Sequence, residues 1–181
     1  MPYYRLAMHP SATVIVLVMH GEPPRDFPRE ALGEYFALHQ RAAWAPEEQA
    51  QEARRRLEAL ERRMRTWPRS PDNDPFYAGS VALARALEQA AGLPVLLAFN
   101  EFCAPDLPET LDRAAAMAGR VVVVSPMMTR GGIHAEAEIP RAVEAARARH
   151  PSVEFVYAWP YPLAEVAGFL ARHLTRFVER P

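Results

Sequence analysis

Residues 14–24 read VIVLVMHGEPP, and the interpretation of the whole chain starts from this stretch. Its first six residues are apolar and mostly β-branched, which is typical of a strand buried on both faces of a sheet. Comparable apolar runs occur at residues 95–99, 121–125 and 153–157. Strands of this kind occur in parallel sheets that carry helices on both faces, so the sequence predicts an α/β fold.

Helical patterns separate these strands. Residues 108–118 and 140–149 carry apolar side chains at intervals of three and four, and residues 80–91 supply a further crossover helix. Residues 162–178 show the same pattern and predict an amphipathic helix that closes the domain. Because strands joined by right-handed crossovers leave few topologies open, we expect a flavodoxin-like or Rossmann-like four-stranded parallel sheet with flanking helices.

The segment between the first two strands is too long for a single crossover helix. From Ala50 to Trp67, apolar residues recur alternately three and four positions apart, as in a helix that packs along a narrow seam. Residues 30–43 are the predicted partner helix, and its expected inward face consists of Leu32, Tyr35, Phe36 and His39. We therefore expect a helical hairpin, inserted at about residues 25–70 of a single domain that spans residues 1–181. This hairpin either covers the cleft or forms the contact of a homodimer.

The composition excludes several kinds of chemistry. The 181 residues are half hydrophobic and carry a net charge of −1, so nothing favours nucleic acid or an anionic membrane as a partner. All 21 basic side chains are arginine. A chain without lysine has neither the phosphate-binding lysine of an ATP-binding P-loop nor the Schiff-base lysine that pyridoxal phosphate requires. The single cysteine, the lack of a leader pattern and a longest apolar run from Ala12 to Met19 predict a cytoplasmic protein that does not span a membrane.

Two histidines follow predicted strands. His20 comes directly after the first strand, and His134 lies in the segment after the third. The carboxyl ends of parallel strands converge on one crevice, so these two side chains are predicted to share a site. Gly21 lets a ligand approach the backbone, and a helix start at about Ile139 would leave His134 in a mobile loop. The alternative is that each histidine only makes a backbone hydrogen bond in its loop.

Three segments together resemble a known family. They are the His-Gly pair at residues 20–21, the Phe-Asn-Glu end of the second strand at residues 99–101, and GIHAEAEIP at residues 132–140. In these motifs the chain is similar to the class II metal chelatases of cobalamin and sirohaem biosynthesis, above all to the small single-domain sirohydrochlorin cobaltochelatases. The resemblance covers residues 12–24 and 79–178.

The resemblance implies an enzyme that inserts a divalent metal ion into a sirohydrochlorin-type tetrapyrrole without ATP. Cobalt and iron are the implied metals, with nickel as a further candidate, and imidazole suits all of them. His20 and His134 would bind the ion as neutral imidazoles, and Glu101 would accept pyrrole protons as the ion enters. The tetrapyrrole would contact the residues around them, namely Gly21, Met127, Met128, Gly131 and Gly132.

Other interpretations stay open. Met127 and Met128 fit buried core positions equally well, and Cys103 fits a structural thiol as well as a ligand. The His-Gly-Glu start also occurs in histidine phosphatases, but Met19 stands where that chemistry needs a phosphate-binding arginine. A non-catalytic flavodoxin-like module that binds a metal or a tetrapyrrole would need the same ligands as the enzyme.

A set of arginines crowds the second helix of the predicted hairpin and the loop after it. These side chains could bind the carboxylates of a tetrapyrrole by bidentate contacts. Alternatively they form a solvated helix face that Glu52, Glu58 and Glu61 balance. The arginines are Arg54, Arg55, Arg56, Arg62, Arg63, Arg65 and Arg69.

Overall fold

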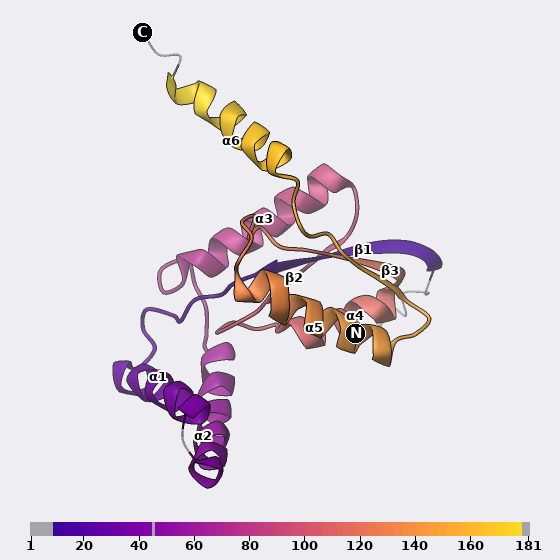
Figure 1. Cartoon of the computed structure of the whole chain (residues 1–181). Coiled ribbons are helices and arrows are strands. Elements are labelled where there is room, and N and C mark those ends of the chain that lie inside the picture. The colour runs from indigo at the N-terminus through magenta and orange to yellow at the C-terminus, as the bar shows by residue number, and fades with distance from the viewer. Residues whose placement is uncertain (1–8, 45, 179–181) are drawn as a thin grey trace, which may run out of the picture.

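The computed structural model describes residues 9–44 and 46–178, and the predicted domain bounds at residues 1 and 181 lie outside the described residues. The chain forms a four-stranded parallel sheet covered by helices (Figure 1). The strands are β1 (His9–Met19), β2 (Val95–Phe99), β3 (Ala118–Val124) and β4 (Glu154–Tyr157). They lie in the order β2-β1-β3-β4. The predicted α/β class, the parallel sheet and its flanking helices are confirmed.

The helices fall where the apolar periodicity predicts them. They are α1 (Arg29–Trp44), α2 (Glu47–Arg65), α3 (Pro75–Ala91), α4 (Leu107–Met117), α5 (Ile139–Arg149) and α6 (Leu163–Val178), with a π-helical turn η1 (His134–Glu138) before α5. Two of them start in the same way, because Asp74 and Asp106 each accept a hydrogen bond from a backbone N–H in the first turn, at 2.8 and 2.9 Å. The Asp74 cap starts α3 five residues before the predicted start.

Alternate residues of β1 face two separate hydrophobic clusters. Val16 and Val18 pack on the face that α4 and α5 cover, together with residues such as Leu111 and Val143. Leu17 and Met19 pack on the other face. There they meet α3 through residues such as Ala84 and the base of the hairpin through Met64, and Phe99 of β2 lies in the same cluster. Burial on both faces explains why this strand is apolar throughout.

The predicted hairpin is present as α1 and α2, which pack against each other to one side of the sheet (Figure 1). The prediction of the inward face of α1 was wrong in part, because Phe36 and His39 are exposed and Leu38 is buried beside Tyr35. Residues 35 and 38 lie three positions apart, so they share one face of α1. This buried face is rotated slightly about the helix axis from the predicted one. Met64, near the end of α2, is fully buried in the sheet's own cluster. The base of the hairpin is therefore part of the core.

The expectation that α6 closes the domain was wrong. No residue of α6 is buried, and Figure 1 shows the helix extending away from the sheet. Its apolar stripe is exposed, at Leu163, Phe169, Leu170, Leu174, Phe177 and Val178. Periodicity identifies an apolar helix face but not the surface that covers it. Among the described residues, none of the helices has the length and apolar character needed to cross a bilayer.

The backbone pairing of β1 with β2 continues past the ends of both strands. The N–H of Asn100 donates to the carbonyl of Met19 at 2.9 Å, and the N–H of Glu101 donates to the carbonyl of His20 at 2.8 Å. Gly21 then lies so close to this segment that a Cβ atom on it would stand 2.0 Å from the Glu101 carbonyl oxygen. Its φ of 97° is also a conformation that favours glycine. Both the lack of space for a Cβ atom and the positive φ therefore require glycine at this position.

Because α6 buries none of its residues, removing it should cost the sheet domain little stability. We expect a chain truncated after Pro162 to unfold thermally within about 2 °C of the full chain. As a positive control, Leu111→Ala in the fully buried core should cost about 2–5 kcal/mol. A large loss of stability on truncation, measured by circular dichroism, would show that α6 packs on the domain in solution.

Gly21→Ala should destabilise the fold by about 3 kcal/mol or more, because it adds backbone strain to a steric clash with the Glu101 carbonyl. Gly92→Ala is the matched control, since Gly92 has a φ of 65° but no atom within 4 Å of the added Cβ. The control should cost only about 1–2 kcal/mol from strain. Chemical denaturation measures both values, and equal losses would contradict a role for the close approach.

Candidate metal centre

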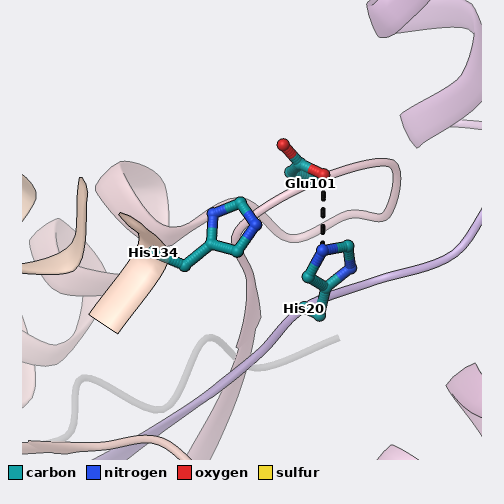
Figure 2. A group of neighbouring side chains, drawn as sticks. All are labelled: His20, Glu101 and His134. Atoms are coloured by element: carbon teal, nitrogen blue, oxygen red, sulfur yellow. Dashed lines mark ion pairs between the residues drawn. The ribbon is translucent and has the colours of Figure 1, made fainter. Parts of the chain in front are cut away.

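Three side chains from three segments meet at the carboxyl edge of the sheet. His20 follows β1, Glu101 follows β2, and His134 is the first residue of η1. The imidazole centroids of His20 and His134 are 4.7 Å apart, and Nε2 of His20 lies 3.6 Å from Oε2 of Glu101 (Figure 2). One potential ligand atom from each residue lies within 4.8 Å of the other two. The structure thus brings together the three residues that the sequence predicted to share a site.

The imidazole of His20 is held in one orientation by the backbone. Its Nδ1 lies 2.6 Å from the carbonyl oxygen of Gly21. A carbonyl oxygen only accepts hydrogen bonds, so Nδ1 carries a proton, and in the neutral imidazole the lone pair is then on Nε2. This Nε2 is the atom that faces Glu101. The ring also packs near Phe102, with centroids 6.2 Å apart, so His20 presents a free nitrogen in a fixed direction.

His134 is held in a similar way by a carboxylate. Its Nδ1 lies 2.7 Å from Oε2 of Glu138, and Nδ2 of Asn100 donates to the same oxygen at 2.6 Å. Burial alone would raise the pKa of Glu138, but the hydrogen bonds from His134 and Asn100, aided by the charge of Arg141, hold it below its ordinary value. Nδ1 of His134 also lies 2.7 Å from Nδ2 of Asn100. In the neutral tautomer in which Nδ1 donates to the ionised Glu138, the lone pair of the ring is on Nε2. Such carboxylate–histidine pairs orient metal ligands in many proteins.

The prediction that His134 lies in a mobile loop was wrong. His134 opens the π-helical turn η1, which runs directly into α5. Pro140 predicts a helix start at about Ile139, but in the first turn of a helix a proline costs only the hydrogen bond of its own missing N–H. The N–H of Ile139 donates to the His134 carbonyl, so the helical turn extends to the amino-terminal side of the proline. This places Glu138 one turn after His134, within hydrogen-bonding reach.

The other predicted contact residues lie around the centre to different extents. Gly21 adjoins it directly. Gly131 and Gly132 are exposed at the start of the segment that leads into His134. Met127 packs partly buried against the core, as its alternative interpretation predicted. Met128 instead lines a pocket of about 570 Å³ with Tyr161 and residues of α6, and none of the three central side chains borders that pocket.

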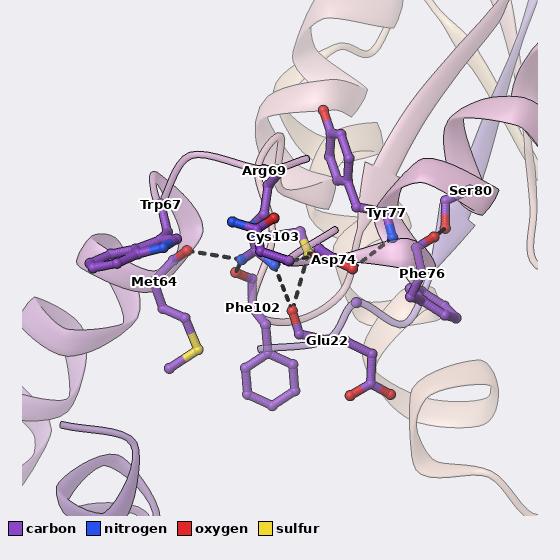
Figure 3. A network of polar contacts seen from close by, with 12 residues as sticks. Glu22, Met64, Trp67, Arg69, Asp74, Phe76, Tyr77, Ser80, Phe102 and Cys103 are labelled. Atoms are coloured by element: carbon purple, nitrogen blue, oxygen red, sulfur yellow. Dashed lines mark hydrogen bonds and ion pairs between the residues drawn. The ribbon is translucent and has the colours of Figure 1, made fainter. Parts of the chain in front are cut away.

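A buried ionic network around Arg69 connects the loops next to the centre (Figure 3). Arg69 pairs with Asp74, and its guanidinium also donates to the carbonyls of Glu22 at 2.7 Å, Met64 at 2.9 Å and Phe102 at 2.6 Å. These contacts join the loop after β1, the end of α2, the loop after β2 and the start of α3. Neither expectation for Arg69, a contact with tetrapyrrole carboxylates or a place on a solvated face, includes this role, because no local pattern marks carbonyl oxygens as its partners.

Cys103 belongs to the same network and not to the metal centre. The thiol is fully buried, and Sγ lies 3.6 Å from the Glu22 carbonyl and 3.8 Å from Asp74. Burial raises the pKa of this thiol, which disfavours the thiolate that binds metals. The structure therefore supports the interpretation of Cys103 as a structural residue.

Most of the seven arginines named in the sequence analysis are paired with acidic side chains of the hairpin. The exposed pairs are Arg54 with Glu47, Arg55 with Glu52, Arg56 with Glu34, and Arg62 with Glu58. Arg63 lies over the rings of Phe27 and Trp67. This arrangement supports a solvated, charge-balanced face over a surface that binds the carboxylates of a tetrapyrrole. Arg65 also pairs with Glu61, but its guanidinium in addition donates to backbone carbonyls of the loop that carries Glu101.

Two comparisons with known proteins show what the chain is similar to. The model of the CbiX family matches residues 73–165, a segment that contains Glu101 and His134 but begins after His20 and the hairpin. A 77-residue segment is 34% identical to the sirohydrochlorin cobaltochelatase of Priestia megaterium. The alignment covers 42% of this chain and 25% of that protein, so the chain matches only about a quarter of the relative's length. Because the family model covers just over half of the residues, the chain belongs to the CbiX family, in agreement with its resemblance to class II metal chelatases.

Proposed function

We propose that this protein is a metal chelatase that inserts Co²⁺ or Fe²⁺ into a sirohydrochlorin-type tetrapyrrole without ATP, in cobalamin or sirohaem biosynthesis. One observation carries the proposal. One potential ligand atom from each of His20, Glu101 and His134 lies within 4.8 Å of the other two, and each imidazole is oriented by a contact at its Nδ1. Family membership and the cobaltochelatase relative support this interpretation.

The two histidines suit the task of holding a metal ion that must later be released. Imidazole nitrogens bind Co²⁺ and Fe²⁺ well, and two protein ligands leave most coordination positions open for pyrrole nitrogens. Their orientation is fixed before the ion arrives, so little ordering is needed on binding. His20 and His134 are partly exposed at the edge of the sheet, which leaves a path for a large, flat substrate.

Glu101 is the proposed proton acceptor. Metal insertion replaces pyrrole N–H bonds with metal–nitrogen bonds, and the released protons must be taken up near the ion. The Glu101 carboxylate lies 3.6 Å from Nε2 of His20 and is about one third exposed. It can therefore reach a bound substrate and pass protons on to solvent.

The direct test is anaerobic incubation of the purified protein with sirohydrochlorin and Co²⁺ or Fe²⁺, followed by absorbance. A metallation rate above that of the protein-free control would support a chelatase. Stoichiometric binding without acceleration would instead identify a metal or tetrapyrrole carrier. Phosphomonoester hydrolysis that persists in EDTA would point to a histidine phosphatase, although Met19 is buried where that enzyme needs an arginine.

His134→Ala should abolish metallation and leave the fold intact, because it removes a proposed metal ligand that lies at the edge of the core. The exposed His39, on α1, provides the control His39→Ala, which should metallate like the wild type. Calorimetric Co²⁺ titration and the absorbance assay measure the two effects together. Unchanged metallation in the His134 variant would contradict the metal centre.

Glu101→Gln should slow metallation about 10²- to 10⁴-fold, because the amide keeps the shape of the carboxylate but does not accept a proton. Metal affinity should fall much less, since both histidines remain. Glu22→Gln is the control, as this exposed side chain lies on the neighbouring loop. A Glu101 variant that metallates at the wild-type rate would show that the proton acceptor lies elsewhere.

A further inference from the structure

The loop between β2 and α4 that carries Glu101 is hydrogen-bonded to the end of α2. Arg65 donates from Nη2 to the carbonyl of Asn100 at 3.1 Å and from Nη1 to the carbonyl of Cys103 at 2.9 Å. The carbonyl of Arg65 in turn accepts from the N–H of Ala104 at 3.2 Å. One residue of the hairpin therefore holds this loop on both sides of Glu101.

Arg65 is itself fixed by a second partner. Its Nε and Nη2 donate to the same carboxylate oxygen of Glu61, at 3.0 and 2.7 Å, and its side chain is only 17% exposed. The guanidinium thus uses its planar set of N–H groups on one carboxylate and two carbonyls. An ammonium group has no such planar array, so lysine would not reproduce these contacts.

The loop has a conformation that needs support. Phe102 has a φ of 57°, which is unusual for a residue with a side chain. Its carbonyl is held by Arg69, and its ring lies between Tyr35 of α1 and the ring of His20, with centroids 5.8 and 6.2 Å away. The hairpin therefore contacts the centre in two ways. Its arginines bind carbonyl oxygens of the loop, and Tyr35 packs on Phe102, which in turn lies near the ring of His20.

The two residues at the start of this loop both act on the proposed centre. The side chain of Asn100 binds Glu138, which orients His134, and the side chain of Glu101 faces His20. A shift of the backbone at Glu101 would move the proposed proton acceptor away from His20. We infer that Arg65 of the helical hairpin is a positioning residue, which fixes the Asn100–Cys103 loop and thereby places Glu101 for catalysis.

This inference rests on the proposed function for its catalytic part, and Arg65→Lys is the variant that tests it. The control is Arg62→Lys on the same helix, which alters an exposed ion pair with Glu58 that does not touch the loop. We expect the Arg65 variant to lower kcat for metallation about 10- to 100-fold, with a modest loss of thermal stability and little change in Co²⁺ affinity. The Arg62 variant should behave like the wild type.

A double-mutant cycle separates positioning from a general structural effect. If Arg65 acts through Glu101, adding Arg65→Lys to Glu101→Gln should slow metallation by less than about twofold beyond Glu101→Gln alone. Full additivity of the two rate losses would overturn the inference, because it would mean that Arg65 acts elsewhere. A wild-type rate for the single Arg65 variant would overturn it as well.

Hydrogen–deuterium exchange gives a measurement that does not depend on activity. Arg65→Lys should speed exchange in the peptide that covers residues 99–104, whereas Arg62→Lys should not. If the wild type does not metallate any tetrapyrrole, the proposed function fails and exchange alone decides whether Arg65 fixes the loop. Unchanged exchange would overturn the inference. Should Arg65→Lys not fold, Glu61→Gln, which weakens the anchor of Arg65, should raise exchange in the same peptide to a smaller extent.

Discussion

The continuation of the β1–β2 backbone pairing past the ends of both strands is the constraint on which the candidate centre depends. It places the backbone of His20 directly against that of Glu101, before any side-chain interaction is formed. The close approach is possible only because Gly21 has no Cβ. Backbone hydrogen bonds between neighbouring chain segments are short and directional, so the separation of the two side chains varies little. The site thus inherits its rigidity from the sheet.

His134 is positioned by a different part of the fold. It comes from the segment between β3 and α5, and its orientation depends on Glu138 one helical turn later and on Asn100 from the β2 end. Asn100 is therefore the residue that connects the two halves of the centre, since its backbone pairs with β1 and its side chain with η1. In a metal site assembled in this way, the ligand side chains have little freedom to move, so a metal ion can bind without rearranging them.

The sequence was sufficient to predict the strands, because residues buried on both faces of a sheet leave continuous β-branched runs such as 14–19. It also located His20 and His134 at one edge, since parallel strands leave little choice about where their carboxyl ends lie. Glu101 was expected there from the resemblance to the chelatases. It did not predict the helical state of His134, because a π-helical turn depends on one altered hydrogen bond near Pro140. Nor did it predict the position of α6, as an apolar stripe does not specify its partner.

The role of the hairpin could not be predicted for a related reason. Arg65 and Arg69 bind backbone carbonyl oxygens. Every residue has a carbonyl, so no pattern of residue types in the sequence identifies these contacts. Yet carbonyls that face away from solvent need donors, and a loop of irregular backbone cannot supply them from its own N–H groups. Arginine serves several such acceptors at once through its planar guanidinium. A helical insertion that ends in two arginines therefore offers the loop of the centre a rigid set of donors, and the site gains its support from the segment that interrupts the fold.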